Sequence, residues 1–152
     1  MKKKHVLLIG LIGMVFILSG CGRSSEKTMT CSRTLNQSGI KTSLEYVITY
    51  QDSYVNRIKS KETIQMDDDS LLEQYKEQVE AIYTPYKDVK YYTYNVSIED
   101  HTLISTADID YAHIDTDKLI EIDSANSSLI KNGKISISDM KSVYEQLGAT
   151  CK

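Results

Sequence analysis

The chain has 152 residues, of which 41% are hydrophobic and 26% are charged, with one Pro and no Trp. This is the composition of one globular domain, and it excludes a disordered or collagen-like chain. Three of the 18 basic side chains belong to Lys2, Lys3 and Lys4, so the chain after residue 20 holds 15 basic and 21 acidic side chains, a net charge of −6. We therefore expect no nucleic-acid partner, because phosphates require a basic footprint.

The N-terminus has the pattern of a bacterial export signal. The three lysines precede an apolar stretch over residues 6–18. As a helix this stretch would be about 20 Å long, short of the roughly 30 Å hydrocarbon core of a bilayer. The pattern therefore predicts a signal peptide over residues 1–20 and not a membrane span.

The segment that follows, Leu18-Ser19-Gly20-Cys21, resembles the lipobox of bacterial lipoproteins. The resemblance implies that the Cys21 sulfur carries a diacylglyceryl group and that palmitate is among the acyl chains. The alternative is an ordinary secretory signal with Cys21 in a disulfide. Two or more acyl chains hold a protein firmly on a membrane. We therefore expect lipidated Cys21 and a short flexible tether over residues 21–28, with the protein on the extracytoplasmic face of the cell membrane.

Two cysteines remain, one near each end of the expected domain. Cys31 and Cys151 form an even pair outside the cytosol, where disulfides persist. We expect them to be bonded to each other. The alternative, a reactive thiol, requires a nearby His and an electropositive pocket, and neither cysteine has such a neighbour in the sequence.

Three strands are expected first. Residues 29–35 form the first, and residues 42–50 alternate strictly, with Leu44, Tyr46, Ile48 and Tyr50 on one face. Residues 54–66 alternate imperfectly and contain several charged side chains. This predicts a long, edge-like strand with a bulge.

A helix follows the acidic run of residues 67–69. Ser70 and Glu73 have the spacing of a capping box, and the helix is expected to end at Thr84-Pro85. The acidic run is interpreted as a helix start and not as a calcium site, because it has no Asp-x-Asp-x-Asp-Gly loop.

The C-terminal half is expected to contain a hairpin and two helices. Residues 89–98 and 102–111 form the hairpin, residues 115–122 a short helix, and a last helix is capped by Ser138 and ends at Gly148. The whole is a single α+β domain over residues 29–152. Its antiparallel sheet of about five strands has two or three helices packed on one face.

This order resembles the YehR-like family of small bacterial lipoproteins. The resemblance rests on the lipobox and on three short segments: Thr30-Cys31-Ser32, Asp108-Ile109-Asp110-Tyr111, and Leu147 to Lys152 at the C-terminus. It implies the α+β fold and the lipid anchor, and it transfers no catalytic residue.

Few residues suggest chemistry. The domain has too few glycines for a phosphate-binding or dinucleotide-binding loop, and no cofactor or metal is expected. His101 and His113 are interpreted as solvated, although two His with carboxylates could form a zinc site. An acidic cluster could bind a cation or supply a carboxylate pair for glycoside cleavage, but its members also suit strand exits and helix caps. The cluster consists of Asp108, Asp110, Asp115 and Asp117.

Tyrosine is the unusual component of the domain. All 11 tyrosines lie after residue 20, where there is no Phe and no Trp. Tyr suits a half-wet surface for a glycan or a protein, and it also suits the rim of a thin core, which we favour. The sequence thus predicts a lipid-anchored, non-catalytic binding or envelope-accessory protein, with an envelope protein or a glycan as its ligand. The alternative is a glycan-directed envelope hydrolase that uses Asp108 or Asp110.

Overall fold

The computed structural model describes residues 24–152. The expected signal peptide, Cys21 and the start of the expected tether lie outside the described residues. The first strand begins at Lys27, inside the expected tether, so the domain starts two residues earlier than predicted. In the described part the strands are β1 (Lys27–Gln37), β2 (Ile40–Gln51), β3 (Tyr54–Gln65), β4 (Tyr92–Glu99), β5 (Thr102–Asp110), β6 (Ile130–Lys131), β7 (Lys134–Ile135) and β8 (Thr150–Cys151). The α-helices are α1 (Asp69–Tyr83), α2 (Thr116–Ile122) and α3 (Ile137–Gln146), with 3-10 turns at Thr84–Tyr86 and Ser124–Ser128.

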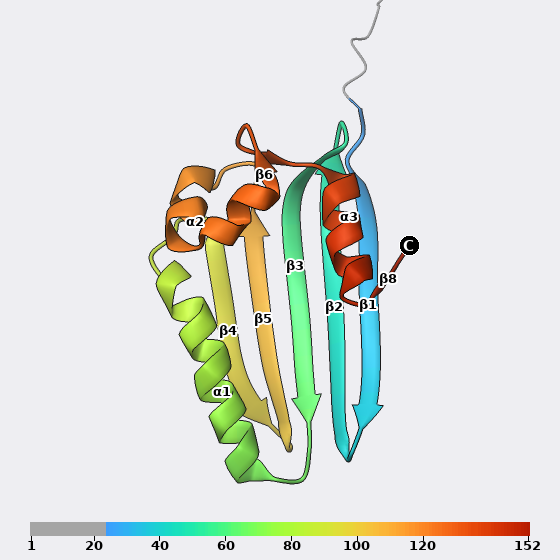
Figure 1. Cartoon of the computed structure of the whole chain (residues 1–152), viewed down its shortest axis with the longest axis vertical. Coiled ribbons are helices and arrows are strands. Elements are labelled where there is room, and N and C mark those ends of the chain that lie inside the picture. Colours follow the sequence, from blue (N-terminus) through green and yellow to red (C-terminus); the bar gives the residue numbers. More distant parts are fainter. Residues whose placement is uncertain (1–23) are drawn as a thin grey trace, which may run out of the picture.

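Six strands form one antiparallel sheet in the order β4-β5-β3-β2-β1-β8, and β6 pairs with β7 in a separate ribbon (Figure 1). The predicted α+β class is confirmed. The sheet has six strands where about five were expected, because β8 adds at the edge beside β1. A strand of two residues is too short to produce an alternation that the sequence could reveal.

Four hairpins are closed by two-residue turns. Both turn residues have positive φ, the pattern of the type I′ turn, whose twist matches that of the flanking strands. The turns are Ser38-Gly39, Asp52-Ser53, Asp100-His101 and Asn132-Gly133.

Strand β3 lies in the middle of the sheet, between β5 and β2, so its predicted edge position is wrong. Its charged residues suggested an edge, but the cations Arg57, Lys59 and Lys61 lie on the face that none of the described helices covers, and Glu62 points to the helix-covered side. The predicted bulge is confirmed: Thr49 pairs with Arg57 and Tyr50 with Val55, which leaves Asn56 as the extra residue.

Both long helices begin earlier than the sequence predicted. Asp68, and not Ser70, caps α1, and its carboxylate accepts the backbone N–H of Leu71 at 3.0 Å. Ser136, and not Ser138, caps α3. In each case the cap has extended backbone angles and the predicted residue already lies inside the first turn. The short helix α2 is confirmed, with Asp115 as its cap.

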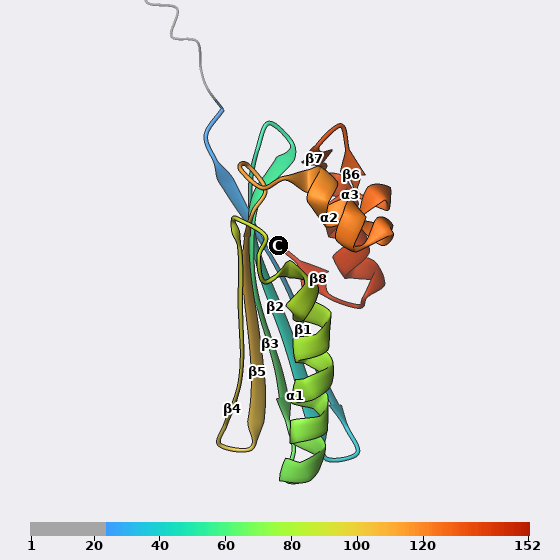
Figure 2. The ribbon, with the colours of Figure 1, turned by 90° about the vertical axis from the view of Figure 1, so that its left-hand side faces the viewer.

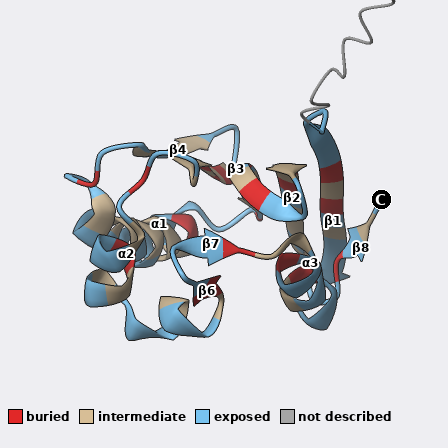
Figure 3. Ribbon diagram, turned by 90° about the horizontal axis from the view of Figure 1, so that it is seen from above, coloured by how far each residue is buried: buried red, intermediate tan, exposed pale blue. Residues whose placement is uncertain are grey.

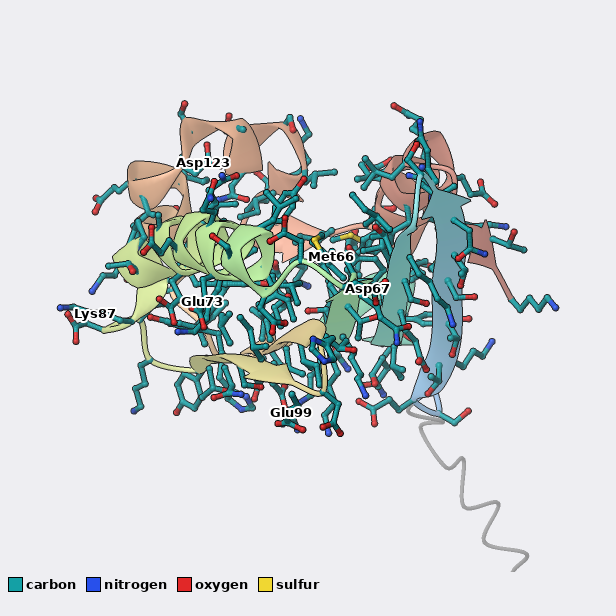
Figure 4. The ribbon with its side chains drawn as sticks, turned by 90° about the horizontal axis from the view of Figure 1, so that it is seen from below. Met66, Asp67, Glu73, Lys87, Glu99 and Asp123 are labelled. Carbon is teal, nitrogen blue, oxygen red and sulfur yellow. A yellow bond between two sulfur atoms is a disulfide. The ribbon has the colours of Figure 1, made fainter. Side chains whose placement is uncertain are left out.

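The helices all lie on one side of the large sheet (Figure 2). Seen from above, β1 has two buried bands in an otherwise more exposed strand (Figure 3); they are Met29 and Cys31, with the half-buried Thr30 between them. The larger cluster of buried residues contains Ile48, Ile58 and Tyr144, and a smaller one contains Met66, Leu72 and Leu103. Met66 lies between α1 and the strands, as the view from below shows (Figure 4). In residues 24–152 no helix is both long and apolar enough to cross a membrane.

Candidate binding site

The tyrosines mainly fasten the helices to the sheet. Three stacked pairs each join a strand to a helix or 3-10 turn: Tyr46 with Tyr144, Tyr83 with Tyr94, and Tyr86 with Tyr92. The exposed tyrosines are Tyr54 and Tyr91, at 43% and 42%. The favoured interpretation of tyrosine as core material is therefore confirmed for most of the set, and the tyrosines do not build an exposed groove.

A polar layer crosses the interior between the two core clusters. Ser60 and Glu62 lie on β3 between Ile58 of one cluster and Ile64 of the other. The Tyr46 hydroxyl donates to Glu62 Oε1 at 2.5 Å. Burial first, and then this hydrogen bond, raise the pKa of Tyr46 far above its ordinary value. The phenol therefore stays protonated and acts as a neutral donor to the carboxylate.

Burial has the same effect on other phenols in the interior. It raises the pKa values of Tyr92 and Tyr144, and it raises the pKa of Tyr111 to about 12. These phenols therefore stay protonated near pH 7 and pack in the interior as neutral groups.

The opposite face of the sheet is polar, and none of the helices within residues 24–152 covers it. Side chains that alternate with the buried ones project from it, since successive side chains of a strand point to opposite faces. Threonine and serine dominate, with a line of cations, Arg57, Lys59 and Lys61, along β3. The hydroxyl residues of this uncovered face include Thr28, Thr30, Ser32 and Thr34 of β1, Ser43 and Thr49 of β2, Thr63 of β3, Thr102 and Thr106 of β5, and Thr93 and Ser97 of β4.

A cavity of about 390 Å³ lies on the uncovered face over β3, β5 and β4. Register places its polar side chains in adjacent positions: Thr93 pairs with Asp108, and Asp108 pairs with Lys59. In the next row Asn95 pairs with Thr106. Ser60, Tyr94 and Ala107 complete the lining.

Asp108 is held at the side of this cavity by two cations. Arg57 donates to both of its carboxylate oxygens, from Nε at 2.6 Å and from a terminal nitrogen at 2.7 Å, and Lys59 Nζ lies 3.9 Å away. The Arg57 hydrogen bonds hold the pKa of Asp108 below its ordinary value, and the same contact raises the pKa of Arg57. Asp108 is therefore an ionised, oriented acceptor.

The predicted aspartate cluster is divided among separate roles. Asp110 accepts the backbone N–H of Ala112 at 3.1 Å and contacts His113 Nδ1 at 2.8 Å. Asp115 caps α2, and Asp117 lies in the first turn of that helix. A glycosidase pair needs one carboxyl group with a raised pKa, whereas the pKa of Asp108 is lowered. Asp110, Asp115 and Asp117 thus match the alternative of strand-exit and helix-start aspartates, whereas Asp108 lies within β5 and pairs with Arg57.

Both histidines of the domain are solvated as predicted, with His101 60% and His113 62% exposed. His101 Nδ1 lies 2.6 Å from Asp69 at the end of the sheet remote from the start of β1. Within residues 24–152, no three His, Cys, Asp or Glu side chains are grouped so that they could hold a metal ion.

The predicted Cys31–Cys151 disulfide is present. The two cysteines are register partners on β1 and β8, and Cys31 is completely buried. Cys21 lies outside the described residues, so its lipidation stays a prediction.

Sequence reasoning identified Asp108 but missed its partners Arg57 and Lys59. Their spacing of two along one strand was a usable signal for a shared face. The sequence did not show that β5 pairs with β3. The two strands are not joined by a hairpin turn, so no local pattern determines this pairing.

The fold and site define a small α+β domain with a six-stranded antiparallel sheet, helices on one face and, on the other, a cavity bordered by Asp108 and Lys59. The chain belongs to the family described as "protein of unknown function (DUF1307)", which it matches over residues 28–150. No curated protein matches the chain.

Two solved structures are similar in fold. The NMR structure of the YehR protein of E. coli superposes with a TM-score of 0.59 at 20% sequence identity, covering 84% of this chain and 91% of that one. The NMR structure of a protein from Streptococcus pneumoniae TIGR4 gives a TM-score of 0.53 at 16% identity, covering 100% of this chain and 98% of that one. The predicted membership of a YehR-like family is confirmed.

Proposed function

We propose that the protein is a lipid-anchored extracytoplasmic binding protein that presents its uncovered sheet face to a ligand. The observation that carries the binding role is the cavity on this face, with the oriented Asp108 carboxylate at its side. Hydroxyl, amide and charged groups converge there, whereas the helix-covered face is occupied by the core.

The lipid anchor is supported by the sequence before residue 22 and by the disulfide. A lipobox-like segment follows an export-type signal, and Cys31–Cys151 is a bond that persists in oxidising compartments. From Cys21 to Lys27 the chain can extend about 20 Å at most. The start of β1 would then lie near the bilayer, with the long strands extending away from it (Figure 1).

The hydrolase alternative finds no support in the geometry. Asp108 is ionised and engaged by Arg57, and Asp110 is engaged by His113 and the Ala112 N–H. Asp108, whose pKa is lowered by Arg57, does not supply the protonated acid that glycoside cleavage requires.

The anchor is tested on the full chain in bacterial cells. We expect the wild-type protein to be in the membrane fraction, to have the mass of a chain beginning with diacylglyceryl-Cys21, and to be degraded by protease added to intact spheroplasts. The variant Cys21→Ala should lack the lipid mass, whereas Cys151→Ala, the matched control, should keep it. An unprocessed wild-type chain in the cytosol with a free Cys21 thiol would contradict the proposal.

A further inference from the structure

We propose that the cavity beside Asp108 is a subsite for one unit of an uncharged oligosaccharide, bound along the uncovered face. This inference rests on the proposed binding function and specifies its ligand class. It is carried by three properties of the site: its balanced charge, its hydrogen-bonding groups and its shape.

The charges around the cavity cancel. Arg57, Lys59 and Lys61 of β3 contribute three positive charges, and Asp108, Asp110 and Glu45, the register partner of Lys61 on β2, contribute three negative ones. Arg57 is committed to Asp108 by two hydrogen bonds, so it is not free to clamp a phosphate or carboxylate of a ligand. A polyanion or a polycation therefore finds no net complementary charge here.

The hydrogen-bonding groups suit a ligand whose groups both donate and accept. Asp108 accepts, Lys59 donates, and the Asn95 amide does both. The Thr93 hydroxyl on β4 donates to the Asp108 carbonyl at 3.5 Å and can still accept, and the Thr106 hydroxyl on β5 can donate and accept. Sugar hydroxyls have this double capacity, so they match a site with both donors and acceptors.

The surroundings disfavour a protein partner. Protein interfaces have an apolar core and a polar rim. Among the outward residues near the cavity, Val47 of β2 and Ile104 of β5 are apolar, and the rest are polar or charged. Val47 and Ile104 are not neighbours on the sheet, because β3 lies between their strands.

The cavity is an open hollow of small-ligand size, built on backbone that the sheet holds in place. Its volume of about 390 Å³ falls within the range of roughly 300–1,000 Å³ for such sites. Its polar groups stand on three paired strands, and Asp108 is already oriented by Arg57. The Asp108 side chain therefore needs no further ordering on binding.

The test uses the full-length lipoprotein, labelled with a fluorophore and kept in detergent micelles. It is applied to an array that carries neutral hexose and hexosamine chains, and also anionic chains with uronate, sulfate or phosphate groups. We expect retention on at least one neutral chain. Asp108→Asn and Thr106→Val should each lower the affinity for it at least tenfold. The controls Glu45→Gln and Thr28→Val remove similar groups from the same face outside the cavity. Each should change the affinity for the neutral chain by no more than about twofold.

Three outcomes would overturn the inference: no retention on any neutral chain, retention on anionic chains alone, or unchanged affinity in both cavity variants. Circular dichroism of each variant separates loss of binding from loss of fold. If the protein carries the Cys21 lipid and is exposed to external protease but binds no neutral chain, the glycan inference fails while the anchored location stands. If Cys21 is unmodified and the array still retains the protein, the location fails and the glycan site stands.

Discussion

At the scale of single residues, the Arg57–Asp108 pair shows how central strands can hold charged side chains without burying them in the core. Both side chains project from the uncovered face, with the Asp108 carboxylate 30% and Arg57 49% exposed. Water therefore screens the pair, and its contribution to stability is small despite the two-point geometry. The pair orients Asp108 more than it stabilises the fold.

The variant Asp108→Asn tests this assignment through pH. A lowered pKa in the folded state contributes stability above the ordinary pKa of 3.8, and that stability is lost as pH falls through the folded-state pKa. At pH 7 we expect the unfolding equilibrium constant of the variant to be larger by about 1.5-fold to fivefold. The difference from wild type should shrink towards zero at acid pH below 3.8.

Urea unfolding at several pH values measures this difference. Asp88→Asn is the matched control, because Asp88 is exposed and forms no ion pair within the described residues. A difference between Asp108→Asn and wild type that grows on acidification would contradict the lowered pKa.

At the scale of elements, alternation identified faces correctly, whereas local motifs misplaced the helix starts. The expected face Leu44-Tyr46-Ile48-Tyr50 lies on the helix-covered side. A prediction from alternation depends on several residues at once, so a single unusual residue does not change it. A capping motif depends on two residues, and the run of three aspartates before Ser70 offered competing caps.

The position of β3 could not be predicted for a different physical reason. Its outward cations would suit an edge strand, where charge discourages further pairing. They equally suit a central strand with one wet face, as antiparallel sheets allow. The return of β5 beside β3 and the addition of β8 beside β1 are long-range pairings that no local pattern encodes. The cavity at Asp108 arises from the first of these pairings, so the site was as unpredictable as the topology.

The start of α1 gives a prediction with an internal control. Asp68→Ala removes the acceptor of the Leu71 N–H and should lower the free energy of unfolding by about 1 kcal/mol. Ser70→Ala replaces a residue inside the first turn with a better helix former and should leave stability unchanged or slightly higher. Thermal or urea unfolding of the two variants measures the contrast. The reverse order would identify Ser70 as the cap.

At the scale of the whole molecule, the two ends of the domain are joined at one sheet edge. Arg33 of β1 donates to the Leu147 carbonyl, and Thr30 and Lys152 exchange backbone hydrogen bonds at 2.9 Å. The disulfide lies between these contacts and links residues 120 apart in the sequence. Since β8 has two residues and few contacts of its own, we infer that the covalent bond, more than pairing, keeps the C-terminal segment on β1.

Removing the disulfide should therefore weaken the whole fold. Closing a loop of this length stabilises by roughly 4–5 kcal/mol in the chain-entropy model, so Cys31→Ala/Cys151→Ala should lose about 4 kcal/mol of unfolding free energy. The loss of the buried Cys31 sulfur acts in the same direction. Hydrogen exchange should show the largest loss of protection at Thr30 and Lys152, whose backbone bonds flank the bond.

Urea unfolding of the oxidised wild type, the thiol-reduced wild type and the double variant measures the effect. The reduced protein and the double variant should unfold at similar, lower urea concentrations, because both lack the same cross-link. Cys21→Ala, which changes a cysteine outside the pair, should match the oxidised wild type. If the double variant unfolds at the wild-type midpoint, β8 is held by its noncovalent contacts, and the edge beside β1 is stable without the covalent link.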